Sequence, residues 1–181
     1  MNSNNLNQIW NIDPAHSRIQ FSVRHMVISE VIGNFKVFDL KMKSSEEDFS
    51  ESEIEFNIDV NSIDTGIPDR DAHLKSDDFF GADKYETISF KSSSLKKLND
   101  EQYKLIGNLT IRNITKPIEL DVELGGIITD PWGNERAGFS IRGTISRFDY
   151  DLKWNSLIET GGAVVSKNVK IICDVEVIKQ K

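Results

Sequence analysis

This chain lacks most features that mark secreted, membrane-spanning or nucleic-acid-binding proteins. Its 181 residues include a single cysteine, so no disulfide can form within the chain, which fits a reducing compartment. No apolar run approaches the roughly 20 residues that cross a bilayer as a helix. Basic residues are also scarce, because 22 Lys and Arg against 29 Asp and Glu give a formal net charge of -7. This charge argues against a nucleic-acid partner and disfavours broad adsorption to anionic membrane surfaces.

The start of the chain shows no secretory signal, because MNSNNLNQIW has neither a basic segment nor an apolar core. We therefore expect a cytoplasmic protein that does not span a membrane. The length and an ordinary composition, with 38% hydrophobic and 28% charged residues, indicate one globular domain. We expect a flexible polar segment over residues 1–9 and a folded domain over residues 10–179.

The dominant pattern in the chain is an alternation of apolar and polar residues. Near the C-terminus Val169, Ile171, Cys173, Val175 and Val177 alternate with mostly polar neighbours. Because successive side chains of a strand point to opposite faces, such a run describes a strand with one buried face. The same period predicts about eight strands, at residues 16–26, 33–43, 52–61, 86–94, 102–111, 117–128, 137–147 and 167–178. We expect an all-β fold, an antiparallel barrel.

Two segments break this alternation and predict one or two short helices. Residues 68–80 begin with Pro68 and acidic residues, as the first turn of a helix prefers. Residues 151–159 carry apolar side chains at a helical spacing before a Gly-Gly pair. Trp154, Phe79 and Phe80 lie in these segments, where they either cover an open end of the barrel or form the packed faces of the helices.

Several motifs along the chain occur in the order of a known family. They are WNIDPAHS (10–17), FSVRH (21–25), GNF (33–35), SIDT (62–65), RDAHLKSDDFF (70–80), GNLTI (107–111), TKPI (115–118) and RFDY (147–150). With them the chain from residue 10 to residue 178 resembles the YceI-like, polyisoprenoid-binding proteins, which have a lipocalin-like β-barrel. The chain departs from the family at Asn113 and Asp151, where Gly is usual, and this leaves the local turn geometry open.

The resemblance implies a lumen that holds an isoprenoid or a fatty-acid-like amphiphile. It also implies that the protein binds or transports this molecule without a reaction, so we expect no enzyme activity and no cofactor. The family has secreted members as well. A homodimer is a further expectation that stays open, because such barrels offer edges and ends for pairing.

The residues alone leave open whether the interior is hollow or filled, since barrels of about eight strands exist in both forms. Gly107, Gly143 and Ser92 have inward parity and are small, which leaves volume, but glycines also relieve crowding at barrel bends. A hollow apolar lumen would accept an apolar chain. A filled barrel would instead be a protein-interaction or stress-related scaffold without a lipid ligand.

For the hollow barrel we expect ligand-binding side chains of inward parity on most strands. The candidates are Phe21, Val23, His25, Phe35, Phe56, Ile58, Phe90, Leu105, Leu109, Leu120, Val122, Phe139, Ile141, Arg147, Ile171 and Val175. His25, at a strand end, either binds a ligand head group or is a structural histidine. Arg147 either clamps a head-group phosphate, as Arg70 also could, or joins an ionic network that closes the barrel. The other members of that network would be Asp149, Asp64 and Arg70.

No arrangement of residues predicts catalysis or a metal site. His16, His25 and His73 do not have the spacing of a zinc site. The Asp-Thr-Gly triplet at 64–66 matches aspartic proteases, but it runs directly into the expected helix, so a hydrolase is only a rival interpretation. Cys173 has inward parity in mid-strand, which is typical of an inert core thiol.

Overall fold

The structure is a computed structural model that describes residues 7–45, 48–156 and 163–181. Its strands are β1 (Gln8–Ile12), β2 (Arg18–His25), β3 (Ser29–Phe35), β4 (Phe38–Ser44), β5 (Glu53–Asp59), β6 (Ile63–Asp64), β7 (Thr87–Lys97), β8 (Gln102–Ile111), β9 (Ile114–Thr129), β10 (Glu135–Ser146) and β11 (Val165–Lys179). The helices of the described residues are α1 (Pro68–Lys75) and the 3-10 helices η1 (Pro14–His16), η2 (Val60–Ser62) and η3 (Arg147–Tyr150). None of these helices is long and apolar enough to cross a bilayer.

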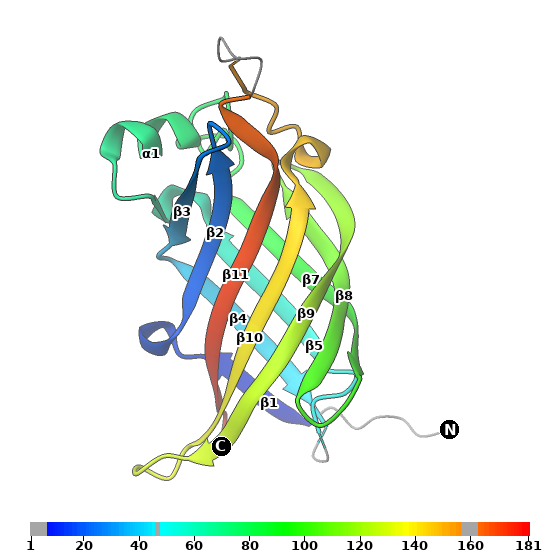
Figure 1. The fold of residues 1–181 in the computed structure, drawn as a ribbon. Helices are drawn as coiled ribbons and strands as arrows, with labels where there is room; N and C mark the ends of the chain where they lie inside the picture. The colour runs from blue at the N-terminus through cyan, green and yellow to red at the C-terminus, as the bar shows by residue number, and fades with distance from the viewer. Residues whose placement is uncertain (1–6, 46–47, 157–162) are drawn as a thin grey trace.

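The strands form one antiparallel sheet that closes on itself (Figure 1). Eight strands follow one another in the order β1-β4-β5-β7-β8-β9-β10-β11, and β1 pairs with β11 to close the ring. Strands β1 and β2 share one edge of β11: β1 pairs with residues 177–179 and β2 with residues 165–174. Strand β3 pairs with β2, and β6 pairs with β3. The expected antiparallel barrel of about eight strands with a short helix is confirmed.

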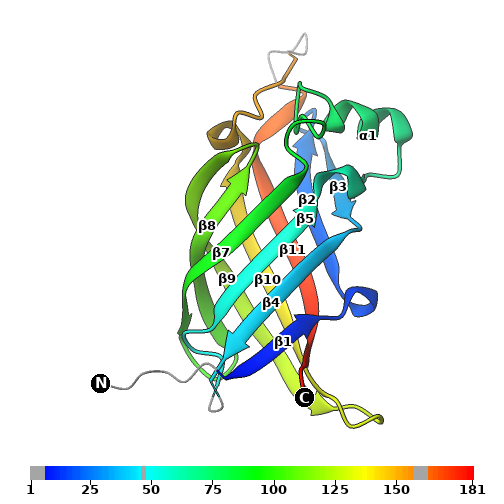
Figure 2. The same ribbon diagram turned by 180° about the vertical axis from the view of Figure 1, so that it is seen from behind.

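The two ends of the barrel are built differently. Helix α1, η3 and the β2–β3 turn lie at one end, which we call the α1 end (Figures 1 and 2). Strand β1, the β9–β10 turn and the C-terminus lie at the other, which we call the β1 end. The β1 end is plugged by Trp10 and Phe49, which are 1% and 3% exposed and whose rings meet edge-on at 5.4 Å. Trp10 Nε1 donates a hydrogen bond to Ser44 Oγ at 3.0 Å, so the ring is buried with its polar group satisfied.

Strand β1 lies across the expected start of the folded domain at residue 10. It begins at Gln8, so the segment expected to be flexible over residues 1–9 ends inside a strand, and residues 1–6 lie outside the described residues. Strand β1 has only five residues, and its apolar residues Ile9, Trp10 and Ile12 do not alternate with polar ones, so the pattern of the sequence does not reveal it. The strand is held by its pairing with β4 and β11.

The strand expected at 33–43 is two strands, β3 and β4, which are separated at Lys36 and Val37. The backbone N–H of Lys36 donates to Ser62 O at 3.2 Å, and the N–H of Asp59 donates to Val37 O at 2.9 Å. The bend is therefore stabilised by η2 and its neighbours, which lie far away in the sequence. Alternation alone continues through such a bend and cannot detect it.

One of the two expected helices is present in the described residues. Helix α1 ends at Lys75, shorter than the expected 68–80, and residues 151–156 form a turn and then no helix. Residues 157–159 of the second expected helix lie outside the described residues. Asp151 and Asn113, the two departures from the family pattern, have positive φ angles of 60° and 71°. Asp and Asn tolerate this left-handed conformation better than most residues, so the turns form without glycine.

We predict that Trp10→Ala lowers the free energy of unfolding by about 3–5 kcal/mol, because it leaves a cavity in the plug of the β1 end. Trp132→Ala is the matched control, because Trp132 is 77% exposed. This control should change stability by no more than about 0.5 kcal/mol. Urea unfolding followed by circular dichroism measures both, and equal effects would show that the β1 end does not depend on the plug.

Candidate functional site

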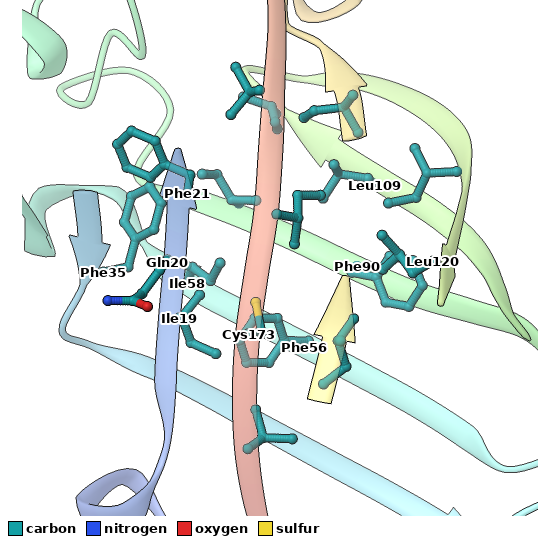
Figure 3. Close-up of a pocket in the computed structure, with 18 of the residues that line it drawn as sticks. Ile19, Gln20, Phe21, Phe35, Phe56, Ile58, Phe90, Leu109, Leu120 and Cys173 are labelled. Carbon is teal, nitrogen blue, oxygen red and sulfur yellow. The ribbon is translucent and has the colours of Figure 1, made fainter. Parts of the chain in front are cut away.

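The barrel encloses an apolar cavity of about 230 Å³ (Figure 3). Its wall is built by the inward side chains of the strands, so the alternation that predicts the strands also predicts most of the lining. Of the candidate residues, those that line the cavity are Phe21, Val23, Phe35, Phe56, Ile58, Phe90, Leu105, Leu109, Leu120, Val122, Phe139, Ile141, Arg147, Ile171 and Val175. Whether they contact a ligand stays a prediction.

His25 is the candidate that does not line the cavity. It is the last residue of β2, where it pairs with Ser29 of β3 and Val165 of β11. Its parity is that of Phe21 and Val23, but its side chain does not line the cavity, although that of its pairing partner Val165 does. Parity predicts the face of a side chain, and it does not predict whether that side chain contacts the cavity at the end of a strand.

The cavity wall is almost entirely hydrocarbon. Its lining side chains with other atoms are Gln20, Met42, Arg147 and Cys173. The amide of Gln20 donates a hydrogen bond to Asn34 Oδ1 at 2.8 Å. Burial raises the pKa of the Cys173 thiol to about 11, so almost no thiolate is present near neutral pH. The wall can therefore exclude water and hold an apolar guest.

Phe79 and Phe80, which follow α1, cover the α1 end of the cavity and line it. The ring of Phe80 meets Phe35 edge-on at 6.0 Å, and Phe79 meets Trp154 at 5.3 Å. His73 of α1 meets Trp154 edge-on at 4.7 Å. These side chains both pack against the barrel and close it. They were absent from the lumen prediction because they lie outside any alternating run.

The small inward residues do not create the cavity. A Cβ on Gly143 would lie 2.3 Å from Leu120 Cδ2, and one on Gly107 would lie 2.4 Å from Phe90 Cζ. These glycines make room for neighbouring side chains, as the relief of crowding predicts. Ser92 lies at a β-bulge, where its Oγ accepts a hydrogen bond from the Ile54 N–H at 2.8 Å. The interpretation of these residues as unfilled volume is wrong.

Arg147 is 3% exposed and binds backbone carbonyls instead of carboxylates. Its Nε donates to Ser166 O at 2.8 Å, its Nη1 to Trp154 O at 2.8 Å and to Leu152 O, and its Nη2 to Val165 O at 3.2 Å. The guanidinium thus joins the start of β11 to the chain after η3. Burial lowers the pKa of Arg147, because the charged form is desolvated.

The expected ionic network around Arg147 is not formed among the described residues. Arg70 donates to the Oγ1 and O atoms of Thr65, and Asp64 pairs with Lys36. Asp149 is exposed. Because Arg147 has no carboxylate partner in the described part of the chain, it is a buried cation in an apolar wall.

The histidines do not come together. His25 ends β2 and His73 lies on α1, whereas His16 is at the β1 end, where it groups with Asp13 and Glu176 within the range of a metal site. Arg136 lies at that group, with Nη1 2.7 Å from Asp13 and 2.6 Å from Glu176. Burial alone would raise the pKa of Asp13, but hydrogen bonds from His16 and Arg136 lower it. The guanidinium therefore supplies the positive charge at this acidic group.

Asp64, the aspartate of the Asp-Thr-Gly triplet, lies on β6 at the rim of the sheet. Its carboxylate pairs with Lys36 and accepts a hydrogen bond from the Gly66 N–H at 2.8 Å. The hydrogen bond from Lys36 is the main cause that lowers the pKa of Asp64. Asp64 is not among the residues that line the cavity.

Comparison with known proteins gives the family. A model of the YceI-like domain matches residues 10–177. A UPF0312 protein of Staphylococcus epidermidis is 38% identical over 168 residues, which make up 92% of this chain and 95% of that protein. A UPF0312 protein of Staphylococcus aureus is 36% identical over the same shares of both chains.

Solved structures share the fold. BcnA of Burkholderia cenocepacia has a TM-score of 0.79 at 21% identity, with 91% of this chain and 98% of that chain covered. The Campylobacter jejuni YceI protein has a TM-score of 0.75 at 33% identity, with 87% and 90% covered. A polyisoprenoid binding domain from Saccharophagus degradans has a TM-score of 0.70 at 17% identity, with 94% and 98% covered. The family model and the relatives cover nearly all of the barrel, and the chain therefore belongs to the YceI-like family of lipocalin-like barrels.

Proposed function

We propose that this protein binds a polyisoprenoid or a similar long-chain amphiphile in the barrel and carries it without a chemical reaction. The observation that carries the proposal is the cavity inside the barrel with its hydrocarbon wall. Each methylene that such a wall removes from water contributes about 0.8 kcal/mol. A chain of repeated apolar units therefore gains affinity with length, whereas a polar metabolite would lose its hydrogen bonds to water on entry.

The size of the cavity favours a slender guest. Its volume of about 230 Å³ is larger than the ~150 Å³ of a dry cavity that accepts benzene. It is smaller than the ~300–1,000 Å³ that is usual for drug-sized ligands. A single prenyl or acyl chain suits this space better than a rigid ring system. The Saccharophagus degradans neighbour is a polyisoprenoid binding domain, and it supports the same ligand class.

The polar end of the ligand lies at the α1 end in this proposal. The β1 end is plugged by Trp10 and Phe49, whereas the α1 end is covered by side chains on connecting segments. Arg147 lies at the α1 end, and its four hydrogen bonds to carbonyls use four of the five N–H donors of a guanidinium. Its positive charge has no carboxylate partner among the described residues, so an anionic or strongly accepting head group is favoured there.

The alternative of a filled barrel that acts as a protein scaffold predicts no internal cavity and no lipid in the purified protein. Native mass spectrometry followed by organic extraction separates the two. A copurifying prenyl or long-acyl species near one per chain supports the proposal. A clean apo mass without uptake of added geranylgeraniol or oleic acid would contradict it. The cytoplasmic location and the homodimer stay predictions, and light scattering tests the latter.

We predict that Ile141→Trp, which places a large ring in the cavity, weakens binding of a fluorescent polyene fatty acid by about tenfold. The ring displaces about two methylenes of the ligand, and a loss of about 1.4 kcal/mol corresponds to a factor of ten. Thr144→Trp is the matched control, because Thr144 lies on the same strand with an exposed side chain. Normal binding by a folded Ile141→Trp variant would show that the ligand does not enter this cavity.

We predict that Cys173 reports occupancy of the cavity. With the pKa of its thiol at about 11, roughly one thousandth is thiolate at pH 8, so iodoacetamide should label the folded protein slowly. Unfolding in urea should restore the rate of an ordinary thiol. Bound oleic acid should slow labelling of the folded protein further, because Cys173 lines the cavity. Fast labelling that oleic acid does not change would contradict the proposed binding site.

A further inference from the structure

The turn between β2 and β3 exposes three consecutive apolar side chains. Met26 is 40% exposed, Val27 is 59% exposed and Ile28 is 87% exposed. Single exposed apolar residues are common, but a contiguous group at a protruding turn marks a contact surface. These three residues, which we call the hairpin tip, contribute little to the core of the protein itself.

The backbone of this turn does not require apolar residues. Met26 and Val27 have φ angles of 48° and 68°, a conformation that Asn and Gly adopt easily and that is strained for a β-branched residue such as Val. The β8–β9 hairpin also turns through two consecutive residues of positive φ, Arg112 and Asn113 at 55° and 71°, in a connection one residue shorter. Polar residues thus suffice for such a turn elsewhere in the barrel. The geometry of the turn therefore does not account for the apolar residues of the hairpin tip.

The hairpin tip lies at the α1 end (Figure 1). At this end the cavity is covered by Phe79 and Phe80, whereas the plug of Trp10 and Phe49 lies at the opposite end. The N–H of Met26 donates to Val164 O at 2.8 Å, so the tip is attached to the chain that leads into β11. Figure 2 shows the β9–β10 turn, which carries the exposed Trp132, at the opposite end of the barrel. A surface that contacts the hairpin tip therefore faces the α1 end.

The charge around the hairpin tip is locally positive, although the chain as a whole is acidic. Arg24 and Lys167 are exposed beside the tip, on β2 and in the irregular part of β11, and neither forms an ion pair among the described residues. Glu30, which lies opposite Arg24 in the β2–β3 register, binds Lys170 at 2.7 Å, and the positive charge of Arg24 also acts on it. Apolar side chains flanked by cations are the pattern of a segment that inserts into the interface of a membrane with anionic lipids.

Two acidic residues at the same end, Asp77 and Asp78, are paired, whereas Asp69 of α1 and Asp149 of η3 are exposed and have no ion pair among the described residues. Asp77 binds Lys84 at 2.7 Å, and Asp78 binds His73 at 2.9 Å. The acidic residues of this end therefore oppose an anionic surface less than their number indicates. The net charge of -7 restricts such contact to this end of the molecule.

We propose that the hairpin tip docks on a lipid bilayer that contains anionic lipids, with Met26, Val27 and Ile28 inserted and Arg24 and Lys167 at the head groups. This inference rests on the proposed function, because docking places the α1 end where an amphiphile enters or leaves the membrane. Its chemistry is distinct from that of the cavity, so the two can fail separately.

The test is sedimentation of the full chain with vesicles of equal parts phosphatidylcholine and phosphatidylglycerol, at low and high salt. The wild type should bind, and high salt or vesicles of phosphatidylcholine alone should weaken binding about tenfold. The double variant Met26→Asn/Val27→Gly supplies the preferred turn residues, so it should unfold at the same or a higher temperature while losing about tenfold in vesicle affinity. Arg24→Gln/Lys167→Gln should remove the salt dependence.

Trp132→Ala, at the opposite end, is the control and should bind vesicles as the wild type does. Retained vesicle binding by the folded Met26→Asn/Val27→Gly variant, or no binding by the wild type, would overturn the proposal. If the hairpin tip binds a protein instead of a membrane, the wild type should not bind vesicles. Uptake of the polyene fatty acid from solution is measured in parallel. Uptake without vesicle binding overturns only the docking, and vesicle binding without uptake overturns only the proposed ligand.

Discussion

The barrel depends on one edge of β11 that is shared by two strands. Strand β2 pairs with its first part and β1 with its end, and the chain crosses between them through η1. The backbone at the crossing stays satisfied, because the N–H of Asp13 donates to Glu176 O and the N–H of Glu176 donates to Ser17 Oγ. Unpaired backbone groups there would cost as much as broken ladder bonds. With these bonds made, β1 can reach β4 and close the ring.

Closure at this strand number leaves the interior only partly filled. The walls alternate apolar and polar side chains, so the inside is hydrocarbon and the outside carries the ion pairs. The β1 end is closed by deep burial of Trp10 and Phe49, while the α1 end is closed by Phe79, Phe80 and Trp154 on connecting segments. Segments that are held by side-chain packing open more easily than a paired sheet. The two ends of the barrel therefore differ. The proposed ligand entry, head-group position and membrane contact are all at the α1 end.

Much of the candidate site could be predicted because parity along a strand is a local property. Phe21 and Val23 of β2 or Phe139 and Ile141 of β10 follow directly from the alternation, and they line the cavity. His25 has the same parity but does not line the cavity. Arg147 was expected either to clamp a head-group phosphate or to join an ionic network, and the structure surrounds it with backbone carbonyl oxygens. Backbone carbonyl partners leave no signal in the side-chain pattern, because every residue carries the same carbonyl group.

The amino-acid sequence by itself determined the β class, most strands and the face that each strand buries, because these depend on side chains two residues apart. Only the tertiary structure decided that β1 closes the ring, that residues 33–43 bend into two strands, and that Phe79 and Phe80 cover the cavity. It also decided that Gly107 and Gly143 accommodate Phe90 and Leu120 instead of leaving open space. These features depend on which side chains meet across the barrel, and such contacts are set by closure and packing in three dimensions.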